Sequence, residues 1–204
     1  MKRLRGVIIL ALLSLTACQT TQSTSLTPRV KGDLFSALVH QESGGRNSAV
    51  SHAGAVGRAQ LTLSTARIMA RKLGYLKVAH LSNRQLKRRL MQDPRLNERL
   101  GRAYLNEGRR RYGRDDIALI YYNGGPKAAN AAYRSWKKTG RLAIYTGETY
   151  CYVKSVAKRS GIKTAPMSLV KGKAYYRNRS RWLQRTGRAP CSQHKMASLS
   201  RRKQ

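Results

Sequence analysis

The chain has 204 residues, 41% of them hydrophobic, so it can bury one ordinary core and has little room for a second. Its 42 lysines and arginines outnumber 8 aspartates and glutamates, and the formal net charge is +34. This excess predicts a polyanion or an anionic surface as partner, and nucleic acid, a cell-wall polymer and a membrane all qualify.

The N-terminal residues have the pattern of a bacterial lipoprotein signal peptide. A basic segment at residues 1–5 precedes an apolar run at residues 7–13 that is too short to span a bilayer. The sequence Leu15-Thr16-Ala17-Cys18 then resembles a lipobox, in which small residues precede a cysteine that receives diacylglycerol. We therefore predict a signal peptide at 1–17 and lipidation of Cys18. The alternative is an apolar helix with a chance buried cysteine.

Export would decide between the possible polyanions, because an exported chain is not expected to bind nucleic acid in the cytoplasm. Gln19 follows the lipidated cysteine. In the best-known sorting systems, a residue other than aspartate at that position sends lipoproteins to the outer membrane. We therefore expect an exported protein, anchored in the cell envelope by its N-terminal lipid, at the outer membrane and facing the periplasm.

The remaining chain divides into a tether, one domain and a basic extension. Residues 18–30 are polar, nearly uncharged and without an apolar period, which predicts a flexible tether after the lipidated cysteine. Residues 31–159 carry the patterns of a single domain. Residues 160–204 are rich in lysine and arginine, and we expect residues 198–204 to be disordered.

The domain is predicted to be mainly α-helical. A first helix begins behind Asp33, carries an apolar stripe from Leu34 to Val39, and ends at Ser43-Gly44-Gly45. Further helices are expected at 64–73, at 84–91, from Asp93-Pro94 to at least 104, at 116–120, at 127–138 and at 148–159, with a turn at 121–126. Only residues 142–145 have a pattern that is compatible with a strand.

The cysteines and histidines suggest a crosslink but no metal site. Cys151 and Cys191 form an even pair in an oxidising compartment, so they are a candidate disulfide. The four histidines lack the spacing of a helical metal site, and we interpret His40 and His52 as surface or packing residues. We predict neither a metal nor another cofactor.

The sequence has only eight carboxylates, so candidate acids can be compared one by one. Six have structural interpretations: Asp33, Asp93, Asp115 and Asp116 as helix caps, and Glu98 and Glu107 as members of a polar, arginine-rich helix face. Of the other two, Glu42 continues the apolar stripe of its helix. Desolvation there would raise its pKa and keep it protonated, as a general acid requires. From spacing alone, a solvated glutamate at a helix end is an equally good interpretation.

Five successive motifs resemble those of the SLT-type lytic transglycosylases. They are Gln41-Glu42-Ser43, Gly54-Ala-Val-Gly57-Arg-Ala-Gln60 with Ser64-Thr65-Ala66, Asp93-Pro94 with Asn97 and Gly101, Ala118-Leu119 through Tyr122-Asn123-Gly-Gly-Pro126, and Glu148-Thr149-Tyr150-Cys151-Tyr152-Val153. Their order and spacing match over residues 34–157. The resemblance implies a lysozyme-like single domain, of the kind found in goose-type lysozyme, with a long substrate groove.

The resemblance also implies a reaction, which is cleavage of the β-1,4 bond between N-acetylmuramic acid and N-acetylglucosamine in peptidoglycan. In that family one glutamate acts as acid on the glycosidic oxygen and then as base on the muramoyl 6-hydroxyl, which closes a 1,6-anhydro ring. Carried over by position, Glu42 is this residue. The substrate-binding residues would be Ser43 and Gln60 along the groove, Tyr122 and Asn123 at the sugar, Tyr152 directed toward the glutamate, and Glu148 as a structural or sugar-positioning carboxylate. Core packing is the alternative role for the tyrosines.

Three positions depart from the family pattern. Arg58-Ala59 stands where leucine-methionine usually precedes the groove glutamine, so we expect a changed subsite preference. Gly124 replaces the usual alanine of its turn, which we expect to loosen the turn. Cys151 interrupts the last motif.

Alternatives to this interpretation concern both partner and activity. The positive charge suits peptidoglycan, whose peptide stems carry carboxylates, and residues 160–204 could dock to an acidic protein partner such as an envelope-spanning secretion or assembly system. A solvated tail without a target is an equal alternative. A hydrolytic, lysozyme-type muramidase and a non-catalytic, wall-binding assembly lipoprotein are the alternative functions.

Overall fold

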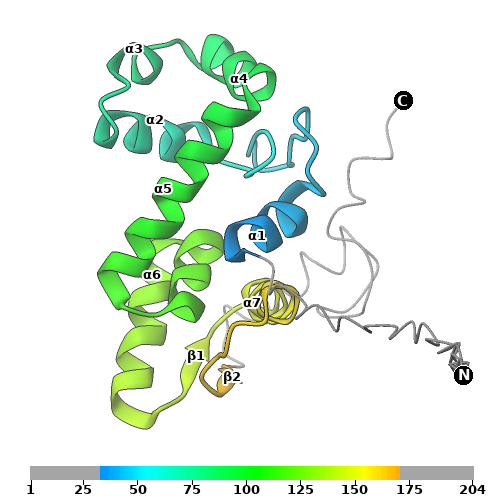
Figure 1. Ribbon diagram of the computed structural model, residues 1–204. Helices are drawn as coiled ribbons and strands as arrows, with labels where there is room; N and C mark the ends of the chain where they lie inside the picture. Colours follow the sequence, from blue (N-terminus) through cyan, green and yellow to red (C-terminus); the bar gives the residue numbers. More distant parts are fainter. Residues whose placement is uncertain (1–32, 171–204) are drawn as a thin grey trace, which may run out of the picture. The chain divides into compact units, whose positions relative to one another are not determined.

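The computed structural model describes residues 33–170 and confirms that the domain is mainly α-helical (Figure 1). The elements are α1 (Leu34–Ser43), α2 (Leu63–Lys72), α3 (Leu76–Ala79), α4 (Asn83–Gln92), α5 (Pro94–Tyr112), α6 (Asp115–Thr139), β1 (Leu142–Ile144), α7 (Gly147–Ser160) and β2 (Met167–Leu169). None of the helices in this part of the chain is long and apolar enough to span a membrane.

Two predicted caps begin their helices as expected. The Asp33 carboxylate accepts a hydrogen bond from the backbone N–H of Ser36 at the start of α1. Asp93 does the same for the backbone N–H of Leu96 at 2.9 Å, and Pro94 occupies the first position of α5, where a missing N–H is not needed. Local side-chain chemistry therefore sets where these helices start.

The interpretation of Asp115 and Asp116 as helix caps is wrong, because Arg114 occupies the cap position of α6. Asp116 is buried and forms two short contacts with the Arg114 guanidinium, at 3.0 and 2.7 Å. Its second oxygen also accepts the backbone N–H of Ala165 at 2.8 Å. Asp116 thus fastens the chain after α7 to the start of α6.

Glu107 also differs from its predicted place on a polar helix face, since it is only 8% exposed. One carboxylate oxygen lies 2.8 Å from Lys72 Nζ on α2 and 3.4 Å from Arg111 on the same helix. Arginine-rich surroundings in the sequence did not distinguish a solvated glutamate from one that bridges two helices.

The predicted turn at 121–126 lies within α6. The helix axis breaks at Gly125, whose φ of 76° and ψ of 178° are not helical, and Pro126 follows as the first residue of the next helical segment. Glycine can adopt this positive φ without strain, and proline needs no N–H donor there. The two predicted helices therefore exist, but they meet at a kink.

The packed domain continues beyond its predicted boundary at residue 159. β2 pairs in parallel with β1, with Leu142 opposite Met167, and Ile162 and Ala165 pack against the core. The strand predicted at 142–145 is thus β1, and its partner comes from the segment that was predicted to be a basic extension. The rest of that extension, residues 171–204, lies outside the described residues.

The part of the core that positions the site forms where four helices meet. α6 contacts α5, α7 and β1, and α1 packs across α7, as Figure 1 shows. The largest fully buried side chains are Leu38, Leu61, Met69, Leu86, Leu90, Leu100, Leu105, Ile117, Leu119, Ile120, Leu142 and Tyr152. This arrangement brings the end of α1 against the middle of α7.

A fully buried asparagine ties the connection between α1 and α2 to α5. Asn97 accepts the backbone N–H of Ala59 at 2.8 Å and donates to the carbonyl oxygen of Val56 at 3.0 Å. Gly57 lies between them at a φ of 78°, and a Cβ there would collide with the Asn97 side chain. The segment of residues 56–60 is therefore held by two buried hydrogen bonds, one accepted and one donated by the same amide side chain.

We expect Asn97→Ala to lower the free energy of unfolding by about 3 kcal/mol, because it leaves two buried backbone groups unsatisfied. Urea unfolding followed by circular dichroism measures this change. Asn106→Ala is the matched control on α5, since Asn106 is exposed, and should change stability by less than about 0.5 kcal/mol. Equal effects of the two substitutions would contradict the role of Asn97.

Candidate active site

Glu42 lies in the last turn of α1, where the helix ends at Gly44 in the left-handed conformation. The residue is half-buried, and the Tyr152 hydroxyl from α7 donates a hydrogen bond of 2.8 Å to its Oε1. Tyr152 is itself almost completely buried. The sequence-based expectation that Tyr152 points toward Glu42 is therefore met in the structure.

The surroundings of Glu42 favour its protonated form. Burial of the carboxyl raises its pKa to about 8, against a lowering by the Tyr152 hydrogen bond and a smaller raising by the negative charge of Glu148. Burial next to this carboxyl also raises the pKa values of Tyr122 and Tyr152 well above the usual value for tyrosine, so both side chains stay neutral. The site thus holds a protonated carboxyl between two neutral phenols at neutral pH.

Two hydrogen bonds join this carboxyl's surroundings to the segment of residues 56–60. The Tyr122 hydroxyl donates to the carbonyl oxygen of Ala59 at 2.7 Å, and the Ser43 hydroxyl donates to that of Arg58 at 2.8 Å. Ser43 is fully buried and also accepts the N–H of Gly45. The structure thus corrects its predicted place on the groove, because its hydroxyl is committed to the backbone.

Gln60 has a positive φ of 47°, the only such non-glycine residue in the described part of the chain. Its side-chain nitrogen donates to the carbonyl oxygens of Ala49 at 3.0 Å and Gly57 at 2.7 Å, so the amide closes the loop on itself. The residue is half-buried. Backbone strain of this kind costs about 1–3 kcal/mol and persists only where surrounding contacts hold it.

The other two predicted positions lie at the start of α7 and at the α6 kink. Asn123 is half-buried, and its Oδ1 accepts a hydrogen bond of 2.7 Å from the Thr149 hydroxyl. Glu148 is exposed, yet near enough to raise the pKa of Glu42. Sequence reasoning missed Thr149 as a site residue, although it is part of the last quoted motif.

The sequence model of the transglycosylase SLT domain matches residues 19–144, more than half of the chain. The chain belongs to the SLT transglycosylase family. No curated protein matches it. A solved structure of an inactive mutant of the lytic transglycosylase Slt from Pseudomonas aeruginosa is 27% identical, with a TM-score of 0.43, over 62% of this chain. The match covers 19% of that much longer chain.

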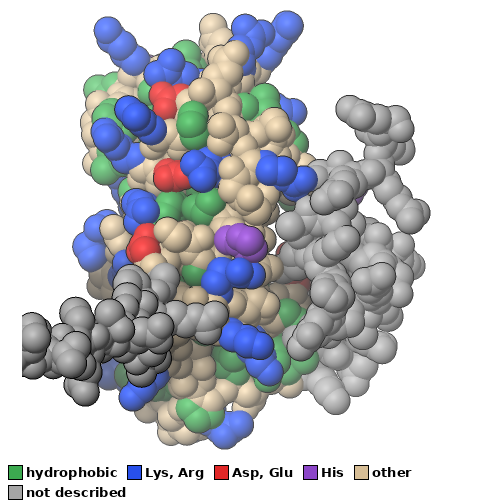
Figure 2. All heavy atoms as spheres, turned by 45° about the vertical axis from the view of Figure 1, so that its right-hand side comes forward, with side chains coloured by type: hydrophobic (Ala, Val, Ile, Leu, Met, Phe, Trp, Pro, Cys, Tyr) green, Lys and Arg blue, Asp and Glu red, His purple; other side chains and the backbone are tan. Residues whose placement is uncertain are grey.

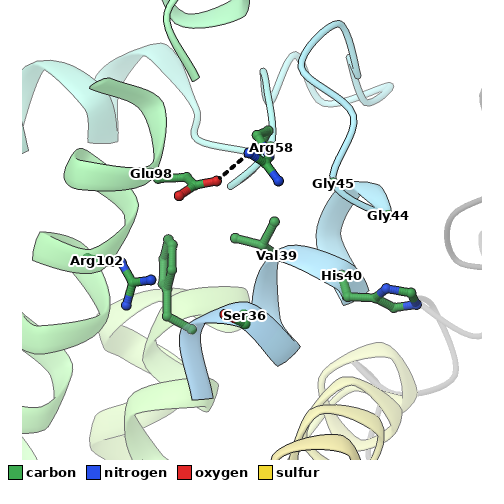
Figure 3. Close-up of a pocket in the computed structure, with 9 residues that line it drawn as sticks. Ser36, Val39, His40, Gly44, Gly45, Arg58, Glu98 and Arg102 are labelled. Atoms are coloured by element: carbon green, nitrogen blue, oxygen red, sulfur yellow. Dashed lines mark ion pairs between the residues drawn. The ribbon is translucent and has the colours of Figure 1, made fainter. Parts of the chain in front are cut away.

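Arg58, a departure from the SLT family pattern, forms an ion pair with Glu98 on α5 at 2.8 Å. Figure 3 shows this pair on one wall of a pocket of about 280 Å³. The pocket is lined by Phe35, Ser36, Val39, His40, Gly44, Gly45, Arg58, Glu98 and Arg102, and Glu42 is not among them. The ion pair therefore anchors the loop to α5 on a side that does not include the candidate acid.

Gly124, the second departure, has a packing reason in this SLT domain. A Cβ at this position would lie 2.9 Å from the Ala128 Cβ and 3.4 Å from the Thr149 hydroxyl oxygen. The glycine therefore allows close packing across the kink, where the sequence suggested only a looser turn.

The cysteine and metal predictions concern residues that lie partly beyond 33–170. Cys151 on α7 is disulfide-bonded. Its predicted partner, Cys191, and the lipidation site Cys18 lie outside the described residues, so both assignments stay predictions. Within residues 33–170, no three histidine, cysteine, aspartate or glutamate side chains are grouped as metal ligands.

The raised pKa predicts how Glu42 affects stability. Because the folded protein holds this proton more tightly than the unfolded chain, stability is lost as the pH rises from the ordinary value of 4.5 through about 8. Glu42→Gln removes this titration. The shift from 4.5 to about 8 corresponds to about 4 kcal/mol between pH 5 and pH 9. We therefore expect the melting temperature of the variant, relative to the native protein, to be roughly 10 °C higher at pH 9 than at pH 5.

Glu148→Gln, which removes an exposed carboxylate, should show a much smaller pH-dependent gain. An equal difference in melting temperature between Glu42→Gln and the native protein at both pH values would show that Glu42 titrates normally.

Proposed function

We propose that this protein is a peptidoglycan lytic transglycosylase that cleaves the bond between N-acetylmuramic acid and N-acetylglucosamine without water. The observation that carries the proposal is the protonated, Tyr152-bonded Glu42 at the end of α1 in an SLT domain. Because the matched structure is much longer than this chain, the activity, substrate and partners all belong to the proposal.

In the first step, Glu42 donates its proton to the glycosidic oxygen, and the bond between that oxygen and C1 of the muramoyl residue breaks. A pKa of about 8 keeps this proton on the carboxyl at neutral pH. The N-acetylglucosamine end leaves with a free hydroxyl. The positive charge that develops at C1 is met by the substrate's own N-acetyl group.

In the second step, the Glu42 carboxylate accepts the proton of the muramoyl 6-hydroxyl. The 6-oxygen then bonds to C1 and closes the 1,6-anhydro ring, so no water is consumed and Glu42 is protonated again. Between the steps the Tyr152 hydroxyl stabilises the carboxylate through its hydrogen bond. One residue can therefore serve as acid and then as base.

The distribution of carboxylates supports a mechanism with a single acid. All eight lie within the described residues, and at least six of them form ion pairs: Asp33 with Arg102, Asp93 with Arg89, Glu98 with Arg58, Glu107 with Lys72 and Arg111, Asp115 with Arg109, and Asp116 with Arg114. Glu148 is exposed. Glu148 is thus the one remaining carboxylate that a two-carboxylate hydrolase could use as base or nucleophile, and the product analysis distinguishes the two reactions.

The anchor and the site of action also belong to the proposal. Lipidation at Cys18 and the following polar segment would hold the domain at the outer membrane within reach of the peptidoglycan. Figure 2 shows lysine and arginine side chains spread over the visible face, with few carboxylates between them. Such a surface attracts the carboxylates of peptide stems over long range. Service to an envelope-spanning assembly system, through the basic residues after 160, is the further part of this proposal.

The central test is the product. We expect the native protein to release 1,6-anhydromuropeptides from purified peptidoglycan, and Glu42→Gln to reduce release by at least about 10³-fold, because it removes the proposed general acid. Mass spectrometry distinguishes anhydro ends from reducing ends, which are heavier by one water. Glu148→Gln serves as the comparison variant and should keep part of the activity.

Reducing ends would instead establish a muramidase. Undiminished clearing of peptidoglycan by Glu42→Gln would contradict the assignment of Glu42, and binding without clearing by the native protein would establish a wall-binding protein.

The anchor is tested separately in cells. We expect [3H]palmitate to label the native protein and not Cys18→Ala, and globomycin to block its processing. Cys151→Ala, which removes another cysteine, should keep the label. A native protein that stays unlabelled and fractionates without membranes would contradict lipidation.

A further inference from the structure

Three side chains at the start of α7 form a directed series of hydrogen bonds that ends on Asn123. The backbone N–H of Thr149 donates to the Thr146 hydroxyl oxygen at 3.2 Å, which is an ordinary helix cap. The Thr146 hydroxyl donates to the Thr149 hydroxyl oxygen at 2.9 Å. The Thr149 hydroxyl in turn donates to Asn123 Oδ1 at 2.7 Å.

The number of available protons fixes the direction of this series. A hydroxyl carries one proton, and the proton of Thr146 is already given to Thr149. Thr149 therefore has its own proton left for one acceptor, and that acceptor is the carbonyl oxygen of the Asn123 amide. Consequently the amide nitrogen of Asn123 faces the other way.

The amide nitrogen of Asn123 is available to a ligand. Among the described residues nothing accepts a hydrogen bond from it, and it is not one of the buried polar atoms that lack a partner. Asn123 follows Tyr122, whose environment includes Glu42, and Thr149 lies one helical turn before Tyr152. The exposed N–H₂ group is thus held next to the residues that surround the candidate acid.

A second helix start in the same molecule shows that the cap does not need an asparagine. At α2 the backbone N–H of Thr65 donates to the Thr62 hydroxyl at 3.2 Å, and the Thr62 hydroxyl donates to Thr65 at 2.9 Å. These distances equal those at α7, and no asparagine is bonded there. The bond from Thr149 to Asn123 is therefore an addition to the cap and not a part of it.

Gly124 lies against the same Thr149 hydroxyl. A Cβ at position 124 would stand 3.4 Å from the Thr149 hydroxyl oxygen, at the short limit of an ordinary contact, and 2.9 Å from the Ala128 Cβ, which is too close. The glycine thus avoids a collision with Ala128 and leaves the space beside the Thr149 hydroxyl open. The departure from alanine thus accompanies a buried, well-packed Thr149.

We infer that Thr149 is a positioning residue that fixes the orientation of the Asn123 amide, so that the site presents hydrogen-bond donors to an acceptor oxygen of the glycan strand. This inference rests on the proposed function for the nature of the ligand. It predicts that the Asn123 amide donates hydrogen bonds to oxygen atoms of the sugar, which are carbonyl, ring or hydroxyl oxygens. A site with a freely rotating amide would offer a donor and an acceptor equally.

The test compares Thr149→Val, which keeps the shape but removes the hydroxyl, with Thr149→Ser, which keeps the hydroxyl. Thr65→Val is the matched control, because it removes the equivalent hydroxyl of the α2 cap. We expect Thr149→Val to raise KM for purified glycan strands about tenfold, the effect of about one hydrogen bond. Thr149→Ser and Thr65→Val should stay within about twofold of the native protein.

Two further measurements separate positioning from folding and from chemistry. The fall of kcat at alkaline pH, which reports Glu42, should stay at the same pH in Thr149→Val. Asn123→Asp, which keeps the bond from Thr149 but replaces the outward donor with an acceptor, should raise KM at least as much. If Thr149→Val melts too early to assay, the pair of Asn123→Asp and Thr149→Ser gives the same comparison.

Binding of glycan strands to the Glu42→Gln protein, measured by calorimetry with and without Thr149→Val, keeps this test independent of the proposed reaction. An absence of anhydro products would then overturn the proposed function and leave the inference standing if Thr149→Val still weakens binding about tenfold. The inference is overturned if Thr149→Val binds as the native residue does. It is also overturned if Thr149→Ser, or Thr65→Val, is as impaired as Thr149→Val.

Discussion

The burial of one carboxyl at the end of α1 is the constraint on which the rest of the site depends. A buried carboxyl group is stable only when it stays protonated or when its negative charge is paired with a cation. No cation is among the groups that shift the pKa of Glu42. The Tyr152 hydroxyl supplies a donor instead, and it can do so only because α7 packs against α1. The packing of α7 on α1 therefore also creates the hydrogen bond between Tyr152 and Glu42, two residues that are 110 positions apart in the chain.

The segment of residues 56–60 is the second element that this constraint requires. It closes the surroundings of Glu42 and has little regular structure of its own, so side chains must hold it. Asn97 from α5, Tyr122 from α6 and Ser43 from α1 each bond to its backbone. Gln60 has a positive φ, and its side-chain amide closes the loop by a hydrogen bond to the carbonyl oxygen of Gly57. The buried polar groups of three helices thus converge on five loop residues, and a loss at any of them would move the walls of the site.

Prediction from sequence succeeded where a signal is local. Asp93-Pro94 and Gly125-Pro126 act through their own backbone geometry, so a helix start and a kink could be located without knowledge of the fold. The short α3 was missed, because four residues offer too little periodicity. The placement of Glu42 on a buried helix face was likewise local, since it needs only the spacing from Leu34 and Leu38.

Prediction failed where the role of a residue is set by a distant partner. Ser43 looked like a groove residue beside the acid, yet its hydroxyl finds the Arg58 carbonyl 15 positions away. Asp116 has the sequence position of a cap, but in the structure its carboxylate accepts the backbone N–H of Ala165, 49 positions later. The sequence of β2 has no recognisable strand pattern, and this strand forms because its backbone pairs with β1.

The scarcity of carboxylates makes these distant partnerships decisive. With 42 cations against 8 acids, a carboxylate is readily paired with a neighbouring arginine or lysine, and at least six of the eight are held in that way. An ion pair occupies the carboxylate and makes it unavailable to a substrate. Glu42 has no such ion pair among the described residues, because the side chains of Tyr152 and Tyr122 lie next to it. In so basic a chain, keeping arginine away from one glutamate is as necessary to the site as placing Tyr152 beside it.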